Sequence, residues 1–363
     1  MRRLHFALLS FVLAVAVQPL VAVTYYVGTC KVGAFGSISA AVAGVPAGST
    51  IDVCPGNYPE QVVISKALTL KGIFSNNSSQ AVIAMPSAGL TTTSSLSYGS
   101  TVAAQVEVNT TGVNITGITV DGTATSTTCP TADYYIGIFY SSGSSGTVDN
   151  VETRNQKCSG SLNGIGIVAE NGAGTAQSVT IENSDVNSYS SGGIWACSNQ
   201  TPSTLTASIK GNFVSGGNLS YYGIITLCVN GLSNAAGSVS GNNISAIGIG
   251  VFADSASSVV SGNTITGGQA GIDVFAPGSI TSNHISGSSV AGIYFEAPGA
   301  NGATVKTNTI TQSPIGIEFN CFTGTVSGNI INGTAKGIDM VPAAFTEVNT
   351  FYNVPTVRTN GAC

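Results

Sequence analysis

Apolar and polar residues alternate in short runs along much of this chain, and the runs belong to a repeating phrase. The phrase is clearest in Val239–Pro342, where it returns at a spacing of roughly 20–25 residues. Each repeat holds two runs with the period of a β-strand, and glycine, serine and asparagine separate them. No repeat shows a helical period, which excludes the helical repeat classes. The pattern predicts short parallel strands stacked coil on coil, because each repeat packs only on its neighbours.

Equivalent residues of stacked strands form rows along such a solenoid, since neighbouring strands lie about 4.8 Å apart and successive side chains point to opposite faces. The isoleucines of the Gly-Ile phrases are expected to form an inward row that makes the core. Its members are Ile165, Ile194, Ile224, Ile249, Ile272, Ile293, Ile317 and Ile338. The asparagines before the strands are expected to stack and to bond to turn backbone. This row holds Asn183, Asn212, Asn242, Asn263, Asn283, Asn308 and Asn329.

Two further rows are expected to face solvent, and they gather the candidate chemistry of the chain. The first holds Gly166, Trp195, Ile225, Gly250, Asp273, Tyr294, Glu318 and Asp339. The second, two places further along each strand, holds Val168, Cys197, Leu227, Phe252, Phe275, Glu296, Asn320 and Val341. The candidate catalytic residues are Asp273, Glu318 and Asp339. The candidate glycan-binding residues are Trp195, Phe252, Phe275, Tyr294 and Glu296, since aromatic faces offer large contact areas to sugar rings.

The spacing of the three carboxylates suggests two chemistries. Glu318 and Asp339 are expected one coil apart, about 5 Å, where one pKa of the pair should be raised and the pair resembles that of a retaining glycosidase. Asp273 and Glu318 are expected two coils apart, near 9.6 Å, at the outer limit for an inverting pair. The alternative is that these acids only keep the outer face soluble. His284 is expected to be solvated, and Arg154 with Lys157 is a weaker candidate for an anionic sugar.

The ends of the chain differ from the repeats. Residues 1–22 have two arginines before an apolar run and small residues around Ala22, a pattern typical of a cleaved signal peptide; the alternative is an uncleaved anchor. Apolar residues at helical spacing after Ser37 predict a short helix that covers the first coil. The expected divisions are 23–73 for the cap and first coils, 74–342 for the solenoid with excursions at 74–105 and 121–134, and 343–363 for a C-terminal cap or tail.

All eight cysteines lie after the predicted signal peptide. An even number of cysteines in an exported chain favours disulfides, and no Cys-x-x-Cys phrase suggests a redox or metal site. The sequence does not fix the connectivity, and we expect local pairs. Cys197 and Cys228 hold nearly equivalent places in successive repeats, so stacking should bring them within bonding range. The expected pairs are Cys30–Cys54, Cys129–Cys158, Cys197–Cys228 and Cys321–Cys363.

The amino-acid composition of the chain limits the classes of partner that we expect. Charged residues are only 7% of the chain and its net charge is −5, while 43% hydrophobic residues indicate a folded protein. No cluster of lysine or arginine is present to neutralise phosphates, so we expect no nucleic-acid partner. We also expect a monomer, secreted or periplasmic, with no membrane contact after cleavage of the signal.

The segment from Ser37 to Ile64, followed by Leu68-Thr-Leu-Lys-Gly72, resembles the opening of pectin lyase-like parallel β-helix proteins. The later Gly-Asn-x-Ile and Gly-Ile-x-Val phrases are similar to the coil repeats of that superfamily. The resemblance implies an all-β, single-stranded, right-handed parallel β-helix with a short N-terminal capping helix, and polysaccharide as the substrate class. Catalytic phrases of pectin methylesterases and polygalacturonases are missing from this sequence, so the resemblance implies no particular activity.

Three functions remain open from the sequence. The first is binding or processing of an extracellular glycan on the outer strand face; a neutral glycan is favoured, since an acidic face repels polygalacturonate. The second is a non-catalytic surface or adhesive solenoid. The third is a polysaccharide lyase assisted by calcium, although the expected outward rows hold no lysine or arginine. No other cofactor is expected.

Overall fold

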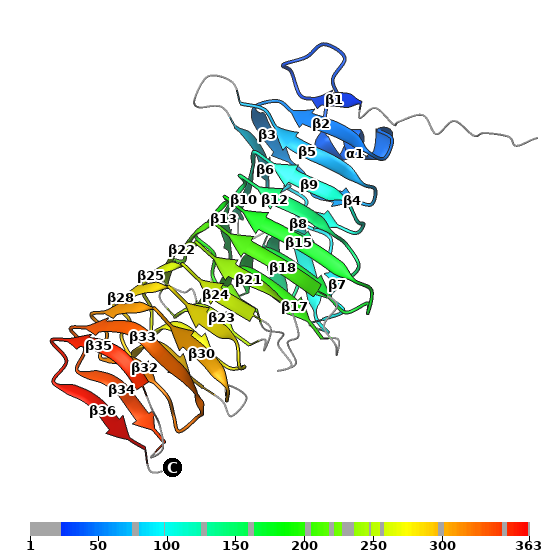
Figure 1. Cartoon of the computed structure of the whole chain (residues 1–363). Coiled ribbons are helices and arrows are strands. Elements are labelled where there is room, and N and C mark those ends of the chain that lie inside the picture. Colours follow the sequence, from blue (N-terminus) through cyan, green and yellow to red (C-terminus); the bar gives the residue numbers. More distant parts are fainter. Residues whose placement is uncertain are drawn as a thin grey trace, which may run out of the picture.

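The computed structural model describes residues 23–74, 80–97, 99–124, 129–158, 163–199, 205–217, 221–226, 236–246, 248–254, 258–296, 301–342 and 347–361. Within these residues the chain winds into a solenoid from β1 (Thr24–Val27) to β36 (Thr356–Asn360), with α1 (Ile38–Gly44) against the β1 end (Figure 1). None of the described helices is long and apolar enough to cross a membrane. The expected signal peptide, 1–22, lies outside the described residues.

A regular coil contributes strands to two sheets. In one coil, β24 (Ser258–Ser261) and β25 (Thr264–Gly267) join a 23-stranded sheet and β26 (Ala270–Val274) joins a 13-stranded sheet. Each strand pairs in parallel with its counterpart one coil further along. Parallel pairing of successive coils gives the expected all-β, right-handed parallel β-helix. The 13-stranded sheet also contains the antiparallel pair of β7 (Thr93–Ser94) with β8 (Thr101–Val108).

The 23-stranded sheet holds, besides β1, β2 (Ser49–Val53), β3 (Gly56–Pro59), β5 (Leu68–Gly72), β6 (Ala81–Ala84), β9 (Val113–Thr116), β10 (Ile118–Thr123), β12 (Gly146–Asp149), β13 (Glu152–Lys157), β15 (Gln177–Glu182), β16 (Asp185–Asn187), β18 (Leu205–Lys210), β19 (Phe213–Ser215), β21 (Ala236–Ser240), β22 (Asn243–Ala246), β24 (Ser258–Ser261), β25 (Thr264–Gly267), β27 (Ser279–Thr281), β28 (His284–Ser286), β30 (Ala303–Lys306), β31 (Thr309–Thr311), β33 (Gly324–Asn332) and β35 (Glu347–Tyr352). The 13-stranded sheet holds, besides β36, β4 (Val62–Ile64), β7 (Thr93–Ser94), β8 (Thr101–Val108), β11 (Tyr134–Tyr140), β14 (Gly164–Asn171), β17 (Gly192–Ser198), β20 (Tyr222–Ile225), β23 (Ile249–Ala253), β26 (Ala270–Val274), β29 (Ala291–Phe295), β32 (Ile315–Glu318) and β34 (Lys336–Val341).

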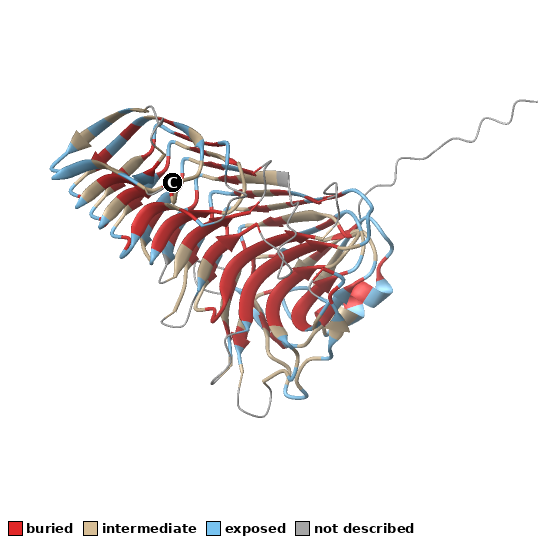
Figure 2. Ribbon diagram, turned by 90° about the horizontal axis from the view of Figure 1, so that it is seen from below, coloured by how far each residue is buried: buried red, intermediate tan, exposed pale blue. Residues whose placement is uncertain are grey.

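Aliphatic rows fill the inside of the solenoid, and Figure 2 shows buried segments side by side in successive strands. The inward row of the 13-stranded sheet is Ile138, Ile167, Ile194, Ile224, Val251, Ile272, Ile293, Ile317 and Ile338. The prediction was wrong for two members of the expected inward row. Ile165 and Ile249 pack instead in an apolar cluster around Trp195 on the other side of the sheet.

A column of glycines explains this correction. A Cβ on Gly271 would lie 2.4 Å from Ile285 Cγ2 and 2.7 Å from the Gly292 carbonyl oxygen, so only glycine fits there. The sequence around Ile165 and Ile249 has two glycines two residues apart, and the second of each pair, Gly166 or Gly250, fills this tight position. Both strands are therefore shifted by two residues from the expected register.

The asparagine row stands at the turn between the first two strands of each coil. Asn263 Oδ1 accepts hydrogen bonds from the backbone N–H and from Nδ2 of Asn242, both at 2.9 Å. The same pattern links Asn212, Asn242, Asn263, Asn283, Asn308, Asn329 and Asn349. Asn183 is not a member: Ser184 takes the next place and donates its N–H to Asn212, while Asn183 donates to Asp149.

The two ends differ in how far they follow the expectations. Ser37 caps α1 as expected, and Glu60 accepts the N–H groups of Ile38 and Ser39, each at 2.8 Å. In the C-terminal segment, expected as a cap or tail, β35 and β36 pair in parallel with β33 and β34 and add another coil. The first excursion is shorter than expected, since β6 pairs regularly with β3 and β10. The second lies between β10 and β11, which end and begin at Thr123 and Tyr134.

Two expected disulfides are present, Cys30–Cys54 and Cys129–Cys158, with Cα atoms 5.7 and 5.9 Å apart. Cys197 and Cys321 are also disulfide-bonded. The partners expected for them, Cys228 and Cys363, lie outside the described residues.

Candidate functional site

One outward row of the 13-stranded sheet changes from apolar to acidic along the solenoid. Its members are Cα partners in successive coils: Phe139, Val168, Trp195, Ile225, Phe252, Asp273, Tyr294, Glu318 and Asp339. The three candidate catalytic carboxylates therefore share one face, as the sequence predicted. Val168 and Phe252 replace Gly166 and Gly250 in the expected row, because of the two-residue shift.

A groove of about 620 Å³ lies on this face where the row becomes acidic. We call it the Asp273 groove. Six of the eight candidate site residues line it: Phe252, Asp273, Phe275, Tyr294, Glu296 and Glu318. The remaining two, Trp195 and Asp339, are not among its lining residues, and the lining holds no lysine or arginine within the described part of the chain.

Aromatic rings form the wall of the groove toward the N-terminal coils. The ring centroids of Phe252 and Phe275 lie 5.9 Å apart with 31° between their planes, and Tyr222 meets Phe252 edge-on at 5.9 Å. Trp195 stands behind this wall between Tyr134 and Tyr222, and only 6% of it is exposed. It supports the wall and offers little surface to a ligand, whereas Phe275 and Tyr294 are partly exposed.

Asp273 is the most unusual carboxyl group of the groove. It is 3% exposed, and its Oδ1 has no hydrogen-bond partner among the described residues. Burial, then the negative charge of Glu296 and a hydrogen bond with that carboxyl, raise the pKa of Asp273 to about 8, against the opposing bond from the Val274 N–H. Asp273 is therefore largely protonated at neutral pH, which is the state of a general acid.

Glu318 and Asp339 occupy neighbouring coils but have different surroundings. Burial and the nearby Asp339 raise the pKa of the half-buried Glu318, and Lys336 opposes this rise. Asp339 bonds to Lys336 Nζ at 2.6 Å, to the Met340 N–H at 3.0 Å and to the Thr359 hydroxyl. These contacts fix the Asp339 carboxylate in place. Lys336 belongs to neither of the two expected outward rows; it is the Cα partner of Ile315 and reaches Asp339 from there.

The sequence did not identify Glu170 as part of this face. Glu170 is the Cα partner of Cys197, in the position that the unshifted register gave to Val168. It is 1% exposed and accepts bonds from the Ser95 hydroxyl, the N–H groups of Leu96 and Ser97, and Ser142 Oγ. Burial raises its pKa although these bonds oppose the rise. Glu170 anchors the segment after β7 against the sheet.

No group of three or more His, Cys, Asp or Glu side chains in the described part of the chain is arranged to hold a metal ion. The site consists of one neutral carboxyl group, two further carboxylates and an aromatic wall. Such a set can bind a ligand with both apolar and hydroxylated faces, and can donate and accept a proton.

Comparison with known proteins agrees with the coil pattern. Residues 222–362 match the family described as the right handed beta helix region. The chain has the right-handed parallel β-helix fold. None of the curated proteins compared with this β-helix matches it in sequence.

Several solved structures resemble this β-helix at low sequence identity, which is a likeness of fold alone. GH136 lacto-N-biosidase from Eubacterium ramulus is 11% identical, with a TM-score of 0.58 over 92% of this chain and 68% of that one. The A-module of Azotobacter vinelandii mannuronan C-5 epimerase AlgE4 is 13% identical, with a TM-score of 0.54 over 89% and 91%. The Streptococcus pneumoniae surface adhesin PfbA is 15% identical, with a TM-score of 0.53 over 89% and 88%.

Proposed function

We propose that this β-helix is an exported protein that binds a neutral glycan in the Asp273 groove and hydrolyses it with Asp273 as general acid. The observation that carries the proposal is a buried, neutral carboxyl group beside an aromatic wall in one open groove. Disulfides such as Cys30–Cys54 and Cys129–Cys158 are compatible with an exported protein.

The lining of the groove favours a neutral sugar chain. The aromatic wall matches the apolar face of a sugar ring, and the acids and Gln269 supply partners for its hydroxyl groups. Glu296 and Glu318 stand in the groove with no basic residue in its lining, so an anionic glycan would be repelled. Among the structural neighbours, the name of the lacto-N-biosidase refers to a carbohydrate, which supports a glycan as the ligand.

In the proposed reaction, Asp273 gives its proton to the oxygen of the leaving sugar as the glycosidic bond breaks. Glu318 stands two coils away, about 9.6 Å, and takes a proton from the water that attacks the anomeric carbon. This separation leaves room for the water and predicts inversion at that carbon. Before the reaction, the negative charge of Glu296 keeps Asp273 protonated. After the reaction, Asp273 takes up a proton from solvent. The negative charge of Asp339, fixed by Lys336, raises the pKa of its neighbour Glu318, which favours Glu318 as the base.

A non-catalytic adhesive β-helix is the second candidate, favoured by the similarity to the adhesin PfbA. Such a protein would bind a glycan in the same groove and release no product. A calcium-assisted lyase is the third candidate. It is tested by adding calcium to the protein and its substrate and measuring ultraviolet-absorbing products.

The test measures reducing ends released from a panel of neutral polysaccharides. Asp273→Asn and Glu318→Gln should each lower the rate by at least about 100-fold, the usual contribution of a general acid or base. Asp339→Asn should have a smaller effect, and Asp149→Asn, on the other sheet, should have none. Binding without cleavage would assign the adhesive function. Full activity of Asp273→Asn would remove Asp273 from the mechanism.

A further inference from the structure

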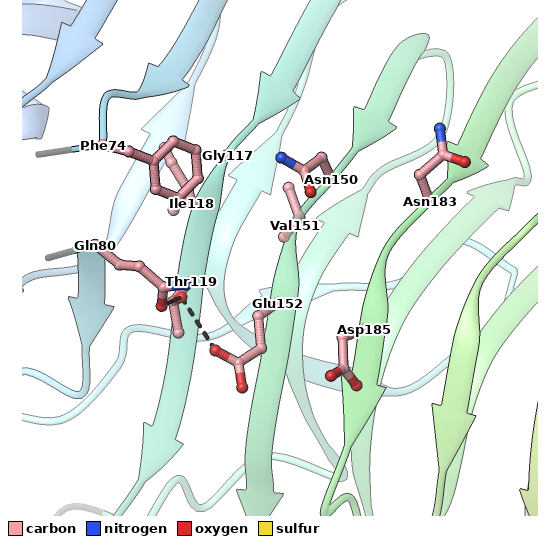
Figure 3. Close-up of a pocket in the computed structure, with 10 residues that line it drawn as sticks. All are labelled: Phe74, Gln80, Gly117, Ile118, Thr119, Asn150, Val151, Glu152, Asn183 and Asp185. Carbon is pink, nitrogen blue, oxygen red and sulfur yellow. Dashed lines mark hydrogen bonds between the residues drawn. The ribbon is translucent and has the colours of Figure 1, made fainter. Parts of the chain in front are cut away.

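A second groove lies on the 23-stranded sheet, on the outer side of β10, β13 and β16 (Figure 3). Its volume is about 350 Å³. Phe74 stands at one end, and Gln80, Thr119, Glu152 and Asp185 lie side by side across adjacent strands. We call it the Phe74 groove. None of its lining residues lines the Asp273 groove.

Hydrogen bonds hold the polar row of the Phe74 groove in place. Thr119, Glu152 and Asp185 are Cα partners in successive coils. Glu152 Oε2 accepts a bond from Arg154 Nη1 at 3.0 Å. The single proton of the Thr119 hydroxyl is shared between Gln80 Oε1 at 2.8 Å and Glu152 Oε2 at 3.2 Å. Asp185 Oδ1 accepts a bond from Asn187 Nδ2 at 3.2 Å. These bonds orient the row, so that its remaining lone pairs can accept hydrogen bonds from a ligand without reordering.

Arg154 already forms ion pairs with carboxylates of this protein, Asp121 and Glu152. Its Nε donates to Asp121 at 2.9 Å. Although burial opposes them, hydrogen bonds from Thr123, Asn155 and Arg154 hold the pKa of Asp121 below its usual value. Arg154 therefore balances one of the carboxylates around it. Asp121, Glu152 and Asp185 outnumber it, so the surface does not favour an anionic ligand.

Exposed aromatic rings flank the polar row on both sides. Phe74 is 59% exposed, and its ring lies on Gly117, whose Cβ would come within 3.3 Å of it. Phe213 is 46% exposed and is the Cα partner of Asp185 in the next coil. From Thr119 to Phe213 the row spans three coil spacings, about 14 Å. Rings that pack on backbone while exposing one face are suited to stack on the apolar face of a sugar.

We propose that the surface from Phe74 to Phe213 is a second, non-catalytic binding surface for neutral oligosaccharides. The rings stack on sugar rings, and the fixed row of Thr119, Glu152 and Asp185 bonds to their hydroxyl groups. The proposal does not depend on hydrolysis at the Asp273 groove. It gives the protein two glycan contacts on different sheets, which raises its affinity for a polysaccharide that reaches both.

The test titrates the full chain with neutral oligosaccharides by calorimetry. Phe275→Ala weakens the Asp273 groove, so the binding left in this variant reports the second surface. In that background Phe74→Ala and Phe213→Ala should each weaken binding about fivefold, as expected for loss of a stacking contact. Asp185→Ala should weaken it as well. Tyr352→Ala, an exposed ring on the far coil β35, is the matched control and should leave the affinity unchanged.

The outcomes separate this proposal from the proposed function. Loss of all binding in Phe275→Ala would overturn the second surface and leave the Asp273 groove as the glycan site. Equal affinity of Phe74→Ala, Phe213→Ala and Tyr352→Ala would also overturn it. Binding that survives Phe275→Ala and weakens with Phe74→Ala supports it, even if no hydrolysis is found.

Discussion

The carboxyl group of Glu296 is hydrogen-bonded to that of Asp273, across one step of the solenoid. Two acids in contact cannot both ionise easily, and the buried one keeps the proton. The sequence had paired Asp273 with Glu318 and Glu318 with Asp339. The structure retains those spacings and adds the closer pair, which gives Asp273 its role in the proposed reaction.

This pair predicts how folding stability depends on pH. The pKa of Asp273 is about 8 in the folded protein and 3.8 in its ordinary state. Between these values the folded state keeps a proton that the unfolded state has lost, so stability falls as pH rises through this window and levels off above it. Chemical denaturation at several pH values should show this fall in the wild type and a smaller one in Asp273→Asn. Equal slopes in the two proteins would contradict the assignment.

The asparagine row should contribute strongly to stability. Asn263→Ala removes the acceptor of the Asn242 N–H and Nδ2, and buried donors without partners cost about 2–4 kcal/mol together. Asn243 follows Asn242 in the chain and is exposed, so it is a matched control. Asn243→Ala should change the free energy of unfolding by less than about 0.5 kcal/mol. Urea denaturation measures both. A similar loss in the two variants would show that the row is not specially stabilising.

The glycine column predicts a position that tolerates no side chain. Gly271→Ala places a methyl group against Ile285 and the backbone of Gly292, and such overpacking costs about 1–3 kcal/mol. A Cβ added at Gly36 would meet no other atom within 4 Å, so Gly36→Ala should be close to neutral. Thermal denaturation distinguishes them, and an unchanged melting temperature for Gly271→Ala would refute the close-approach explanation.

Glu170 should hold the segment after β7 in place. Glu170→Ala removes the acceptor for the N–H groups of Leu96 and Ser97, so these amides should exchange with deuterium faster than in the wild type. The control is Glu182→Ala, which removes an exposed bond to Lys210 on the other sheet. Unchanged exchange at Leu96 and Ser97 would mean that other contacts fix the segment.

The fold could be predicted from the sequence because each part of the repeat has a physical role in the coil. Alternating apolar residues form the strands, asparagine forms the turn, and glycine allows close approach of neighbouring coils. The predicted register was wrong where two glycines in one repeat allowed two alignments. Gly250, not Gly248, stands eight positions after its row asparagine, as Gly271 does after Asn263, and this count would have given the correct register. It would also have placed Phe252 beside Asp273.

Other features had no signal in a single sequence. The contact of Glu296 with Asp273 depends on side-chain directions across coils, and that of Glu170 with Ser95 joins residues far apart in the chain. The last coil was missed because its Gly-Ile phrase is absent, although Asn349 continues the asparagine row. The Phe74 groove joins residues from before and after the first excursion, which no repeat brings together.

The most direct test of the central claim is the titration of the Asp273 carboxyl carbon, followed by nuclear magnetic resonance in protein labelled at aspartate. The account predicts a midpoint at a pH of about 8, which falls in Glu296→Gln because the neighbouring negative charge is gone. A midpoint near that of an ordinary aspartate, unchanged by Glu296→Gln, would contradict it.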